Sequence, residues 1–368
     1  MTVALLTILV LVCLYVFYRL WSPFGGTLAG ARKRLVRASA HNRNGKFVNL
    51  VVTTLQMDVG SLVSMTADHF RPNAHLRPDR PIVPDAPDLA GITGAADTQL
   101  VWLGHSSFIL RIGGKTLLLD PVLSKRASPF QFAGPKRFAG SAVITPDALP
   151  HIDAVVISHD HYDHLDYGTI RALRAKTGRF FVPLGVGAHL ERWGVHSDAI
   201  TELDWWETAT LDDVQLACTP ARHFSGRRIG GHDTTLWASW VLMAGRERVF
   251  FSGDTGYGPH FADIGKKYGP FDLTLMECGQ YDRRWSDIHM MPEQTVAASH
   301  DLHSRLLLPI HWGAFTLAFH EWTDSVERAL RAAHTIDLPV ATPRMGQIVL
   351  LKDAEQSTGP WWKAVAAD

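Results

Sequence analysis

The chain has 368 residues, of which 46% are hydrophobic and 20% charged, and its 36 Lys and Arg balance 36 Asp and Glu. This length suits one large domain or two modest ones, and the composition is that of a globular protein. The zero net charge argues against a protein built to hold nucleic acid, which carries a basic surplus. Three cysteines, Cys13, Cys218 and Cys278, are too few for a disulfide framework. Cys13 lies in an apolar run, and Cys218 and Cys278 are expected as free, buried thiols in a reducing compartment. The unusual count is histidine, with 19 residues.

The N-terminus begins with an uninterrupted apolar run, residues 2–18, which ends at Arg19. A membrane span needs about 17–25 apolar residues, so the run predicts a transmembrane anchor over residues 1–20. A cleaved signal peptide, which would lack its basic leading region, and a buried terminal helix are the alternatives. Basic residues follow the run and none precedes it. The positive-inside rule therefore places the body on the cytoplasmic face of an inner or plasma membrane.

Residues 21–97 are predicted to form a linker and an extended arm. A short amphipathic stretch, residues 47–65, leads into a segment rich in proline and aspartate, residues 71–89. Proline removes backbone donors and biases the preceding residue to extended geometry. We therefore expect this segment to be neither a helix nor a central strand, and to lie along the surface of the body.

From about residue 98 the pattern changes to short apolar runs that predict strands. Gly113-Gly114, between two such runs, is a two-residue hairpin signal. Helical periodicity appears between later runs, so an α/β fold with stacked sheets and outer helices is expected. The predicted strands are 101–103, 107–112, 115–119, 154–157, 180–182, 214–218, 236–243, 249–251, 273–276, 306–310 and 348–351, and the predicted helices are 169–176, 261–268, 292–302 and 324–334.

A cluster of metal-binding residue types follows one of these strands, where the chain reads HDHYDH from His159 to His164. Because a helix is predicted next, the cluster lies on a loop at the carboxyl end of a strand, where ligand sites of α/β folds lie. His159 and His161 can reach one metal, and Asp163 and His164 a second. A lone histidine is usually an ordinary core or surface residue, but desolvating so polar a loop costs several kcal/mol unless a cation satisfies it. Such ligands favour Zn²⁺, and suit Mn²⁺ or Fe²⁺ less specifically.

The H-x-H-x-D-H string resembles the signature of the metallo-β-lactamase superfamily of hydrolases. Further segments resemble its N-acyl-phosphatidylethanolamine-hydrolysing phospholipase D subfamily: WLGHSS at 102–107, DP at 120–121, RASP at 126–129, GPKRF at 134–138, TPARH at 219–223, FSGDTGY at 251–257, GPFDL at 269–273 and PIHWG at 309–313. The resemblance covers residues 98–351. It implies a four-layer αββα sandwich over residues 98–352, with two metals in a cleft at the sheet edges, followed by a C-terminal tail, residues 353–368.

The resemblance also implies the metal ligands. The first metal would be held by His159, His161 and His223, the second by Asp163, His164 and His311, and Asp254 would bridge the two. Each of these residues follows a predicted strand. Asp163 and Asp254 would thus serve catalysis through the metals they hold.

Three further residues are expected near the metals. The resemblance places His289 where it could protonate the leaving alkoxide, although it could also simply begin the next helix. Asp120 is expected to orient the loop of residues 159–164 (the histidine loop) or one of its ligands. The alternative is that Asp120 is only a turn residue before Pro121. His105 could approach the site or close a hairpin. Asp166 is expected to cap the following helix rather than to hold a ligand.

The implied activity is that of a zinc phosphodiesterase, which cleaves an N-acylphosphatidylethanolamine into phosphatidic acid and an N-acylethanolamine at a membrane. One alternative is a dinuclear-metal hydrolase of a soluble lactone or phosphodiester, and another is a non-enzymatic, membrane-tethered metal-binding factor.

Two positions argue against other activities of the superfamily. A di-iron oxygen-reducing relative would usually carry Glu where His161 stands, and an antibiotic-opening relative would often carry Cys where Asp254 stands. A phospholipid or other phosphodiester is the expected substrate, and the oligomeric state, a homodimer included, stays open.

Overall fold

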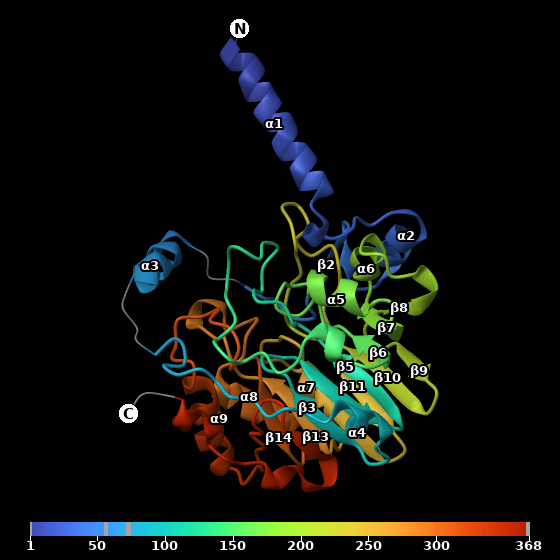
Figure 1. The fold of residues 1–368 in the computed structure, drawn as a ribbon, viewed down its shortest axis with the longest axis vertical. Coiled ribbons are helices and arrows are strands. Elements are labelled where there is room, and N and C mark those ends of the chain that lie inside the picture. Colours follow the sequence, from blue (N-terminus) through green and yellow to red (C-terminus); the bar gives the residue numbers. More distant parts are fainter. Residues whose placement is uncertain (1, 55–57, 71–74, 366–368) are drawn as a thin grey trace.

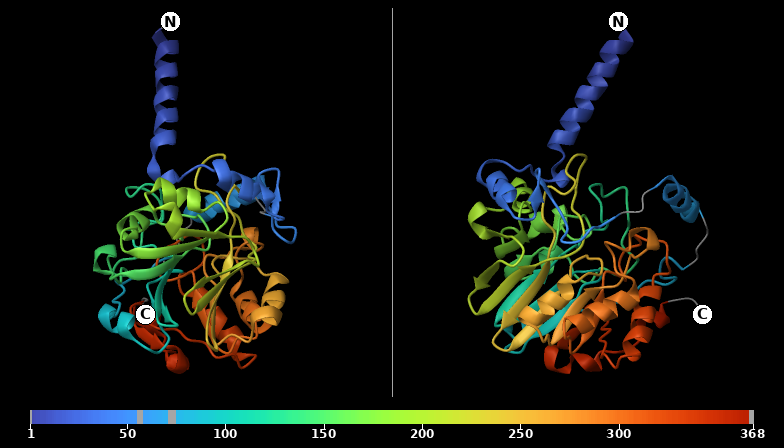
Figure 2. Two further views of the ribbon diagram at one scale, coloured as in Figure 1. Left: turned by 90° about the vertical axis from the view of Figure 1, so that its right-hand side faces the viewer. Right: turned by 180° about the vertical axis from the view of Figure 1, so that it is seen from behind.

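A computed structural model describes residues 2–54, 58–70 and 75–365. Two β-sheets lie face to face with helices on their outer faces, and α1 projects from one end of this body (Figure 1; Figure 2). The structure thus has the mixed α/β architecture with stacked sheets that the sequence predicts.

The first sheet has seven strands in the order β15-β3-β4-β5-β6-β7-β8. Its antiparallel part contains β15 (Ile348–Leu350), β3 (Gln99–Trp102), β4 (Phe108–Ile112) and β5 (Lys115–Leu119), and its parallel part continues with β6 (Ile152–Val156), β7 (Thr177–Pro183) and β8 (Ile200–Leu203). The β4–β5 connection is the predicted hairpin. Gly113 and Gly114 have φ of +55° and +70°, which glycine adopts without the steric cost that other residues carry.

The second sheet has six strands in the order β14-β13-β12-β11-β10-β9. These are β9 (Thr208–Leu211), β10 (Val214–Thr219), β11 (Ser239–Ala244), β12 (Glu247–Phe251), β13 (Leu273–Glu277) and β14 (Leu307–Ile310), of which β12, β13 and β14 run parallel. Both faces of the central strands are buried, which explains why they read as continuous apolar runs.

Successive side chains of each strand point to opposite faces and so join different cores. Leu117 and Leu119 of β5 belong to the core between the sheets, which also contains Trp240 and Phe251 of the second sheet, whereas Leu118 belongs to the core on the outer face. The outer face of the first sheet packs on α5 (Tyr167–Leu173) and α6 (Gly187–Arg192), and that of the second on α7 (His260–Tyr268), α8 (Pro292–Asp301) and α9 (Asp324–His334). The layers therefore follow the order helix, sheet, sheet, helix.

The N-terminal part contains more structure than the predicted linker and arm. Its elements are α1 (Thr2–Leu20), α2 (Gly30–Ala38), the hairpin of β1 (Asn42–Arg43) and β2 (Lys46–Phe47), α3 (Val59–Phe70) and α4 (Leu89–Gly94). Residues 71–74 of the predicted arm lie outside the described residues, and residues 75–88 contain no helix or strand, as expected from their prolines. None of the helices in the described residues is long and apolar enough to cross a membrane, so the predicted transmembrane span is not confirmed.

Short 3₁₀ helices complete the chain: η1 (Ser22–Phe24), η2 (Pro146–Ala148), η3 (Ser197–Ala199), η4 (Arg283–Trp285), η5 (Leu351–Gln356) and η6 (Trp361–Ala364). The described part of the C-terminal tail packs on the body through Trp362, whose side chain is buried and whose Nε1 donates to Glu327 Oε1 at 2.7 Å. Residues 366–368 lie outside the described residues. Cys218 and Cys278 are buried free thiols, as expected.

Candidate metal centre

The histidine loop leaves the carboxyl end of β6 and returns into α5. Asp166 ends the loop as the N-cap of α5, and its side chain accepts hydrogen bonds from the backbone N–H groups of Gly168 and Thr169. Such caps satisfy donors that the first helical turn leaves free. Of the two roles considered for Asp166, the structure places it in the cap.

One group of side chains joins this loop to the second sheet. The ligand atoms of His159, His161, His223 and Asp254 all lie within 4.8 Å of one another. His161 Nδ1 is 2.9 Å from His159 Nε2 and 3.2 Å from His223 Nε2. His223 follows β10 and Asp254 follows β12, so three strand ends converge here.

A second group lies beside the first and comprises His105, Asp163, His164 and His311, again with ligand atoms within 4.8 Å. Asp163 Oδ2 is 3.5 Å from His164 Nε2 and 4.0 Å from His311 Nε2. The side chain of His105 approaches the site, with its Nε2 3.0 Å from Asp163 Oδ2. Its backbone forms an isolated β-bridge with Trp312, which connects the loop after β3 to the loop after β14.

Asp254 lies between the two groups. Its Oδ2 is 3.8 Å from both His159 Nε2 and His223 Nε2, and 3.0 Å from His164 Nε2. Its Oδ1 is 3.1 Å from His311 Nδ1. This carboxylate can therefore contact cations in both groups at once.

The donor set fits divalent cations. His164 Nε2 and Asp254 Oδ1 are buried, and although the ionic contacts given above lie close to them, neither atom forms a hydrogen bond of suitable geometry with a described residue. Such an arrangement costs about 1–3 kcal/mol per group when nothing else satisfies it. Burial lowers the pKa of His159 and of His223 well below the usual value, with neighbouring histidines adding to the effect, so both imidazoles are neutral and can act as ligands. Burial raises the pKa of Asp254 to about 6.

His164 shows the excess of negative charge around the site. Burial would lower the pKa of its imidazole, but the carboxylates of Asp254 and Asp163 raise it well above the usual value. A buried region that holds these carboxylates among imidazoles attracts positive charge, and a divalent cation supplies it.

Asp120 orients two of the histidines. Its Oδ2 is 2.7 Å from His164 Nδ1, and its Oδ1 accepts from the Ser158 N–H at 2.7 Å. The Ser158 hydroxyl bonds to the same carboxylate and lies 2.9 Å from His159 Nδ1. With their Nδ1 atoms engaged, His164 and His159 direct Nε2 toward Asp254.

His289, which is partly exposed, pairs with a buried carboxylate, Glu277, that was not predicted from the sequence. Its Nδ1 is 3.0 Å from Oε2 of Glu277, the last residue of β13, and Glu277 Oε1 accepts from the Met290 N–H at 2.5 Å. Glu277 is fully buried. The available signal was its position, because Glu277 is the last residue of a buried strand and the predicted ligands come shortly after such strands.

Arg227 was also missed. Its Nη1 donates to the carbonyl oxygens of Asp160 at 2.6 Å and of Leu165 at 2.7 Å, and so holds both ends of the histidine loop. The sequence around a buried arginine that donates to backbone carbonyls does not differ from that around a surface arginine, so this role could not be predicted.

A cavity of about 330 Å³ opens over the two groups. Its polar base includes His161, Asp163, Asp254, His289 and His311, and its walls are mainly apolar, with Met65, Phe224, Trp285, Ile288 and Leu317. The site can thus hold a charged group at its base and hydrocarbon against its walls.

Comparisons with known proteins agree with this geometry. Residues 115–312 match the family model described as "Beta-lactamase superfamily domain". An uncharacterised protein of Mycobacterium tuberculosis is 44% identical over 92% of this chain and 91% of its own length. N-acyl-phosphatidylethanolamine-hydrolyzing phospholipase D 1 of Caenorhabditis elegans is 33% identical over 67% of this chain and 74% of its own length.

A solved structure shares the fold at low sequence identity. Igni18, a metallo hydrolase from the archaeon Ignicoccus hospitalis, superposes with a TM-score of 0.54 at 21% identity, over 69% of this chain and 98% of that protein. Family model, relatives and fold therefore agree: the chain belongs to the metallo-β-lactamase superfamily of hydrolases, and within it resembles the N-acyl-phosphatidylethanolamine-hydrolysing phospholipase D group.

Proposed function

We propose that this hydrolase is a zinc phosphodiesterase of the phospholipase D type, which converts N-acylphosphatidylethanolamine into phosphatidic acid and N-acylethanolamine. One observation carries the proposal: a base of histidines and aspartates lies under a cavity whose walls are mainly apolar. Such a cavity suits a substrate with a phosphodiester next to hydrocarbon chains. The similarity to the C. elegans phospholipase D supports the same substrate class.

The proposed metal ligands are those that the sequence resemblance implies. His159, His161 and His223 would hold one Zn²⁺, and Asp163, His164 and His311 the other, with Asp254 shared between them. When bound, two such cations supply a water of lowered pKa and neutralise charge that develops on the phosphoryl oxygens.

The protein's own groups set the geometry and move a proton. Asp120 and Ser158 fix His164 and His159 in the orientation described above. Cleavage of the phosphorus–oxygen bond on the ethanolamine side leaves an alkoxide that needs a proton. His289 lines the cavity, and Glu277 engages its Nδ1. When the ring has taken up a proton released by the attacking water, its Nε2–H can donate that proton to the alkoxide. The ring then returns to the neutral form, which burial favours because it lowers the pKa of His289.

We also propose that α1 holds the catalytic body at the cytoplasmic face of a membrane. The described apolar side chains along this helix are exposed, for example Leu6 at 62% and Leu9 at 59%. Apolar side chains exposed over the length of a helix favour contact with lipid or with another apolar surface. A membrane-bound body would meet its lipid substrate where that substrate resides.

Product mass spectrometry tests the reaction. Zinc-loaded protein in mixed micelles is incubated with N-acylphosphatidylethanolamine, and His161→Ala serves as the blank. We expect phosphatidic acid and N-acylethanolamine in equal amounts from the intact protein alone. A folded, metal-loaded sample that yields neither product would refute the lipid substrate and direct the search to soluble phosphodiesters and lactones. Asp254→Asn should abolish turnover without unfolding the protein.

His289→Gln separates the proton donor from the metal ligands. The substitution removes an ionisable group but keeps a polar side chain of similar size, so we expect kcat to fall by about 10²-fold or more. Metal content, measured by elemental analysis, should stay at that of the parent protein. A variant that lost its metal together with its activity would contradict the role of His289 as a proton donor.

A further inference from the structure

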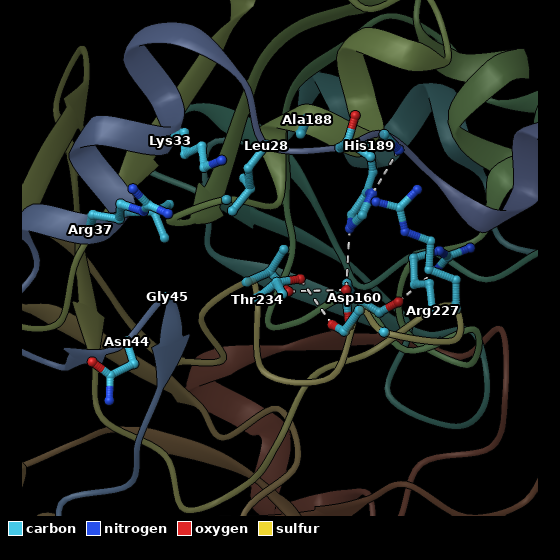
Figure 3. A pocket seen from close by; sticks show the side chains of 18 residues that line it. Leu28, Lys33, Arg37, Asn44, Gly45, Asp160, Ala188, His189, Arg227 and Thr234 are labelled. Atoms are coloured by element: carbon cyan, nitrogen blue, oxygen red, sulfur yellow. Dashed lines mark hydrogen bonds and ion pairs between the residues drawn. The ribbon is translucent and has the colours of Figure 1, made fainter. Parts of the chain in front are cut away.

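A second cavity, of about 350 Å³, lies behind the histidine loop on the side where α1 joins the body. It is bounded by α2, by α6 and by the loop of residues 226–235 (Figure 3). None of its lining residues also lines the cavity over the metal centre. The reaction proposed above gives this cavity no role.

Several cationic side chains line this second cavity. Lys33 and Arg37 are four residues apart on α2, and Figure 3 shows both reaching from that helix toward the opposite wall. Arg228 contributes a third cation from the loop. Over the described residues, none of these three forms an ion pair, whereas the neighbouring Arg32 is paired with Glu191 and Glu202.

The acidic lining residue, Asp160, is already satisfied. Its Oδ1 accepts from the Gly226 N–H at 2.8 Å, and its Oδ2 accepts from Thr235 Oγ1 at 3.0 Å and lies 3.2 Å from His189 Nε2. The guanidinium of Arg227 is likewise committed to backbone carbonyls. Lys33, Arg37 and Arg228 therefore remain as free donors around a cavity with an excess of positive charge. Phosphate, with several strong acceptor oxygens, matches such a set.

The rim of this cavity indicates where the phosphate comes from. Ile229, between the lining residues Arg228 and Gly230, is 89% exposed, and the Tyr18 hydroxyl at the end of α1 donates to its carbonyl oxygen at 2.6 Å. Outside the cavity, at the foot of α1, Phe132 is 81% exposed; its ring lies tilted at 5.5 Å from that of Phe130, which in turn stacks on Phe17. Exposed apolar side chains at the same end of a molecule as unpaired cations are the combination that binds anionic lipid surfaces.

We propose that this cavity binds the phosphate group of an anionic membrane phospholipid, as a lipid site separate from the metal centre. Lys33, Arg37 and Arg228 contact the phosphate, and Ile229 and Phe132 lie against the hydrocarbon region. The bound lipid fixes the body beneath α1, so that lipid contact at this end of the molecule depends on specific side chains and not on the apolar helix alone.

Calorimetric titration tests this site without reference to the reaction. The full chain, in neutral detergent and carrying His161→Ala so that nothing is hydrolysed, is titrated with short-chain phosphatidylglycerol. Lys33→Gln/Arg37→Gln should weaken binding by at least about tenfold, since each cation near a lipid surface contributes about fivefold. The matched pair Arg331→Gln/Lys363→Gln removes two exposed cations from α9 and the C-terminal segment, and binding should stay within about twofold of the parent.

Two further measurements complete the test. The exchange Lys33→Arg/Arg37→Lys keeps both charges and should retain binding, which separates lost charge from altered folding. Inorganic phosphate is titrated in parallel to separate a lipid phosphate from a soluble one. Binding of phosphatidylglycerol that is unchanged in Lys33→Gln/Arg37→Gln would overturn the site. Binding of inorganic phosphate alone, with no binding of the lipid, would overturn the lipid as its ligand.

Discussion

Single residues far from the histidine loop in sequence control its geometry, and Asp120 is the clearest example. This residue directly follows β5, and its carboxylate engages Ser158 and His164, which follow the neighbouring strand β6. Partners that orient a ligand typically contribute about 10–100-fold to metal affinity. The orientation of His164 thus depends on a residue 44 positions away.

We predict that Asp120→Asn lowers zinc affinity by about 10–100-fold. The amide offers one acceptor oxygen where the carboxylate offers two, so it cannot hold Ser158 and His164 together. Competition with a chelator of known affinity measures the change. Asp153→Asn is the matched control, because Asp153 accepts from Thr116 at the other end of β6, away from the site. Equal zinc affinity in Asp120→Asn and the parent would show that Asp120 acts only as a turn residue.

The seven metal ligands predicted from the sequence share one property, which is that each follows a strand within a short recognisable string. The structure brings all seven predicted ligands together, and it adds His105 to the second group. Glu277 was not predicted because its role depends on His289, which reaches it from 12 positions later in the chain. Sequence spacing alone does not encode which buried carboxylate a distant imidazole will meet.

At the scale of elements, burial decided which strands could be predicted. β13 and β14 are fully buried, and their apolar runs indicated them to within a residue. β8 and β9 lie at sheet edges, where only one of their eight residues is buried, and their mixed sequences gave no strand signal. α2 was missed because its charged sequence, GARKRLVRA, buries only Val36.

The buried imidazole of His260, the first residue of α7, should make the stability of the protein depend on pH. Burial lowers the pKa of His260 to about 3, and the nearby Arg222 contributes to the shift. In the unfolded chain, the imidazole of His260 takes up a proton as the pH falls through about 6.5. In the folded protein the same imidazole takes up its proton only near pH 3. Between about pH 6.5 and pH 3 the unfolded state therefore holds the extra proton, and the free energy of unfolding falls as the pH falls, by up to about 1.4 kcal/mol per pH unit.

We expect His260→Gln to reduce this slope. Urea unfolding of metal-free protein at several values between pH 4.5 and 6.5 measures it for the parent and the variant. The variant should be less stable than the parent at pH 6.5, because Gln replaces a packed imidazole that lies 3.2 Å from Thr255 Oγ1, and the difference should narrow toward pH 4.5. Parallel pH profiles would show that His260 does not carry the dependence.

At the scale of the whole molecule, the two sheets meet at the candidate metal centre. The histidine loop follows β6 of the first sheet, whereas His223, Asp254 and His311 follow β10, β12 and β14 of the second. The proposed cations would therefore link the sheets and stabilise their packing. A ligand held only by the folded state adds about 2.7 kcal/mol at a free concentration of 100 Kd.

Removal of metal should accordingly lower Tm. Protein dialysed against a chelator is compared with the same protein after Zn²⁺ is restored, by calorimetry at neutral pH. We expect Tm to drop on removal and to recover on reloading. The variant Asp254→Asn, which lacks the shared carboxylate, should show a smaller recovery. An unchanged Tm after complete removal, verified by elemental analysis, would contradict a linking role for the cations.

The contribution of α1 to function is also a property of the whole molecule, because this helix projects from the body and does not touch the metal centre (Figure 1). Removing residues 1–16 preserves the aromatic contacts of Phe17 and Trp21 with Phe130, so the body should keep its structure.

If α1 brings the body to lipid, the shortened chain should cleave substrate in mixed micelles at the parent rate, since micelles reach the site by diffusion. On vesicles its initial rate should fall by about tenfold or more. Release of phosphatidic acid from the same substrate in both forms provides the comparison, and equal vesicle rates with and without residues 1–16 would show that catalysis does not depend on α1.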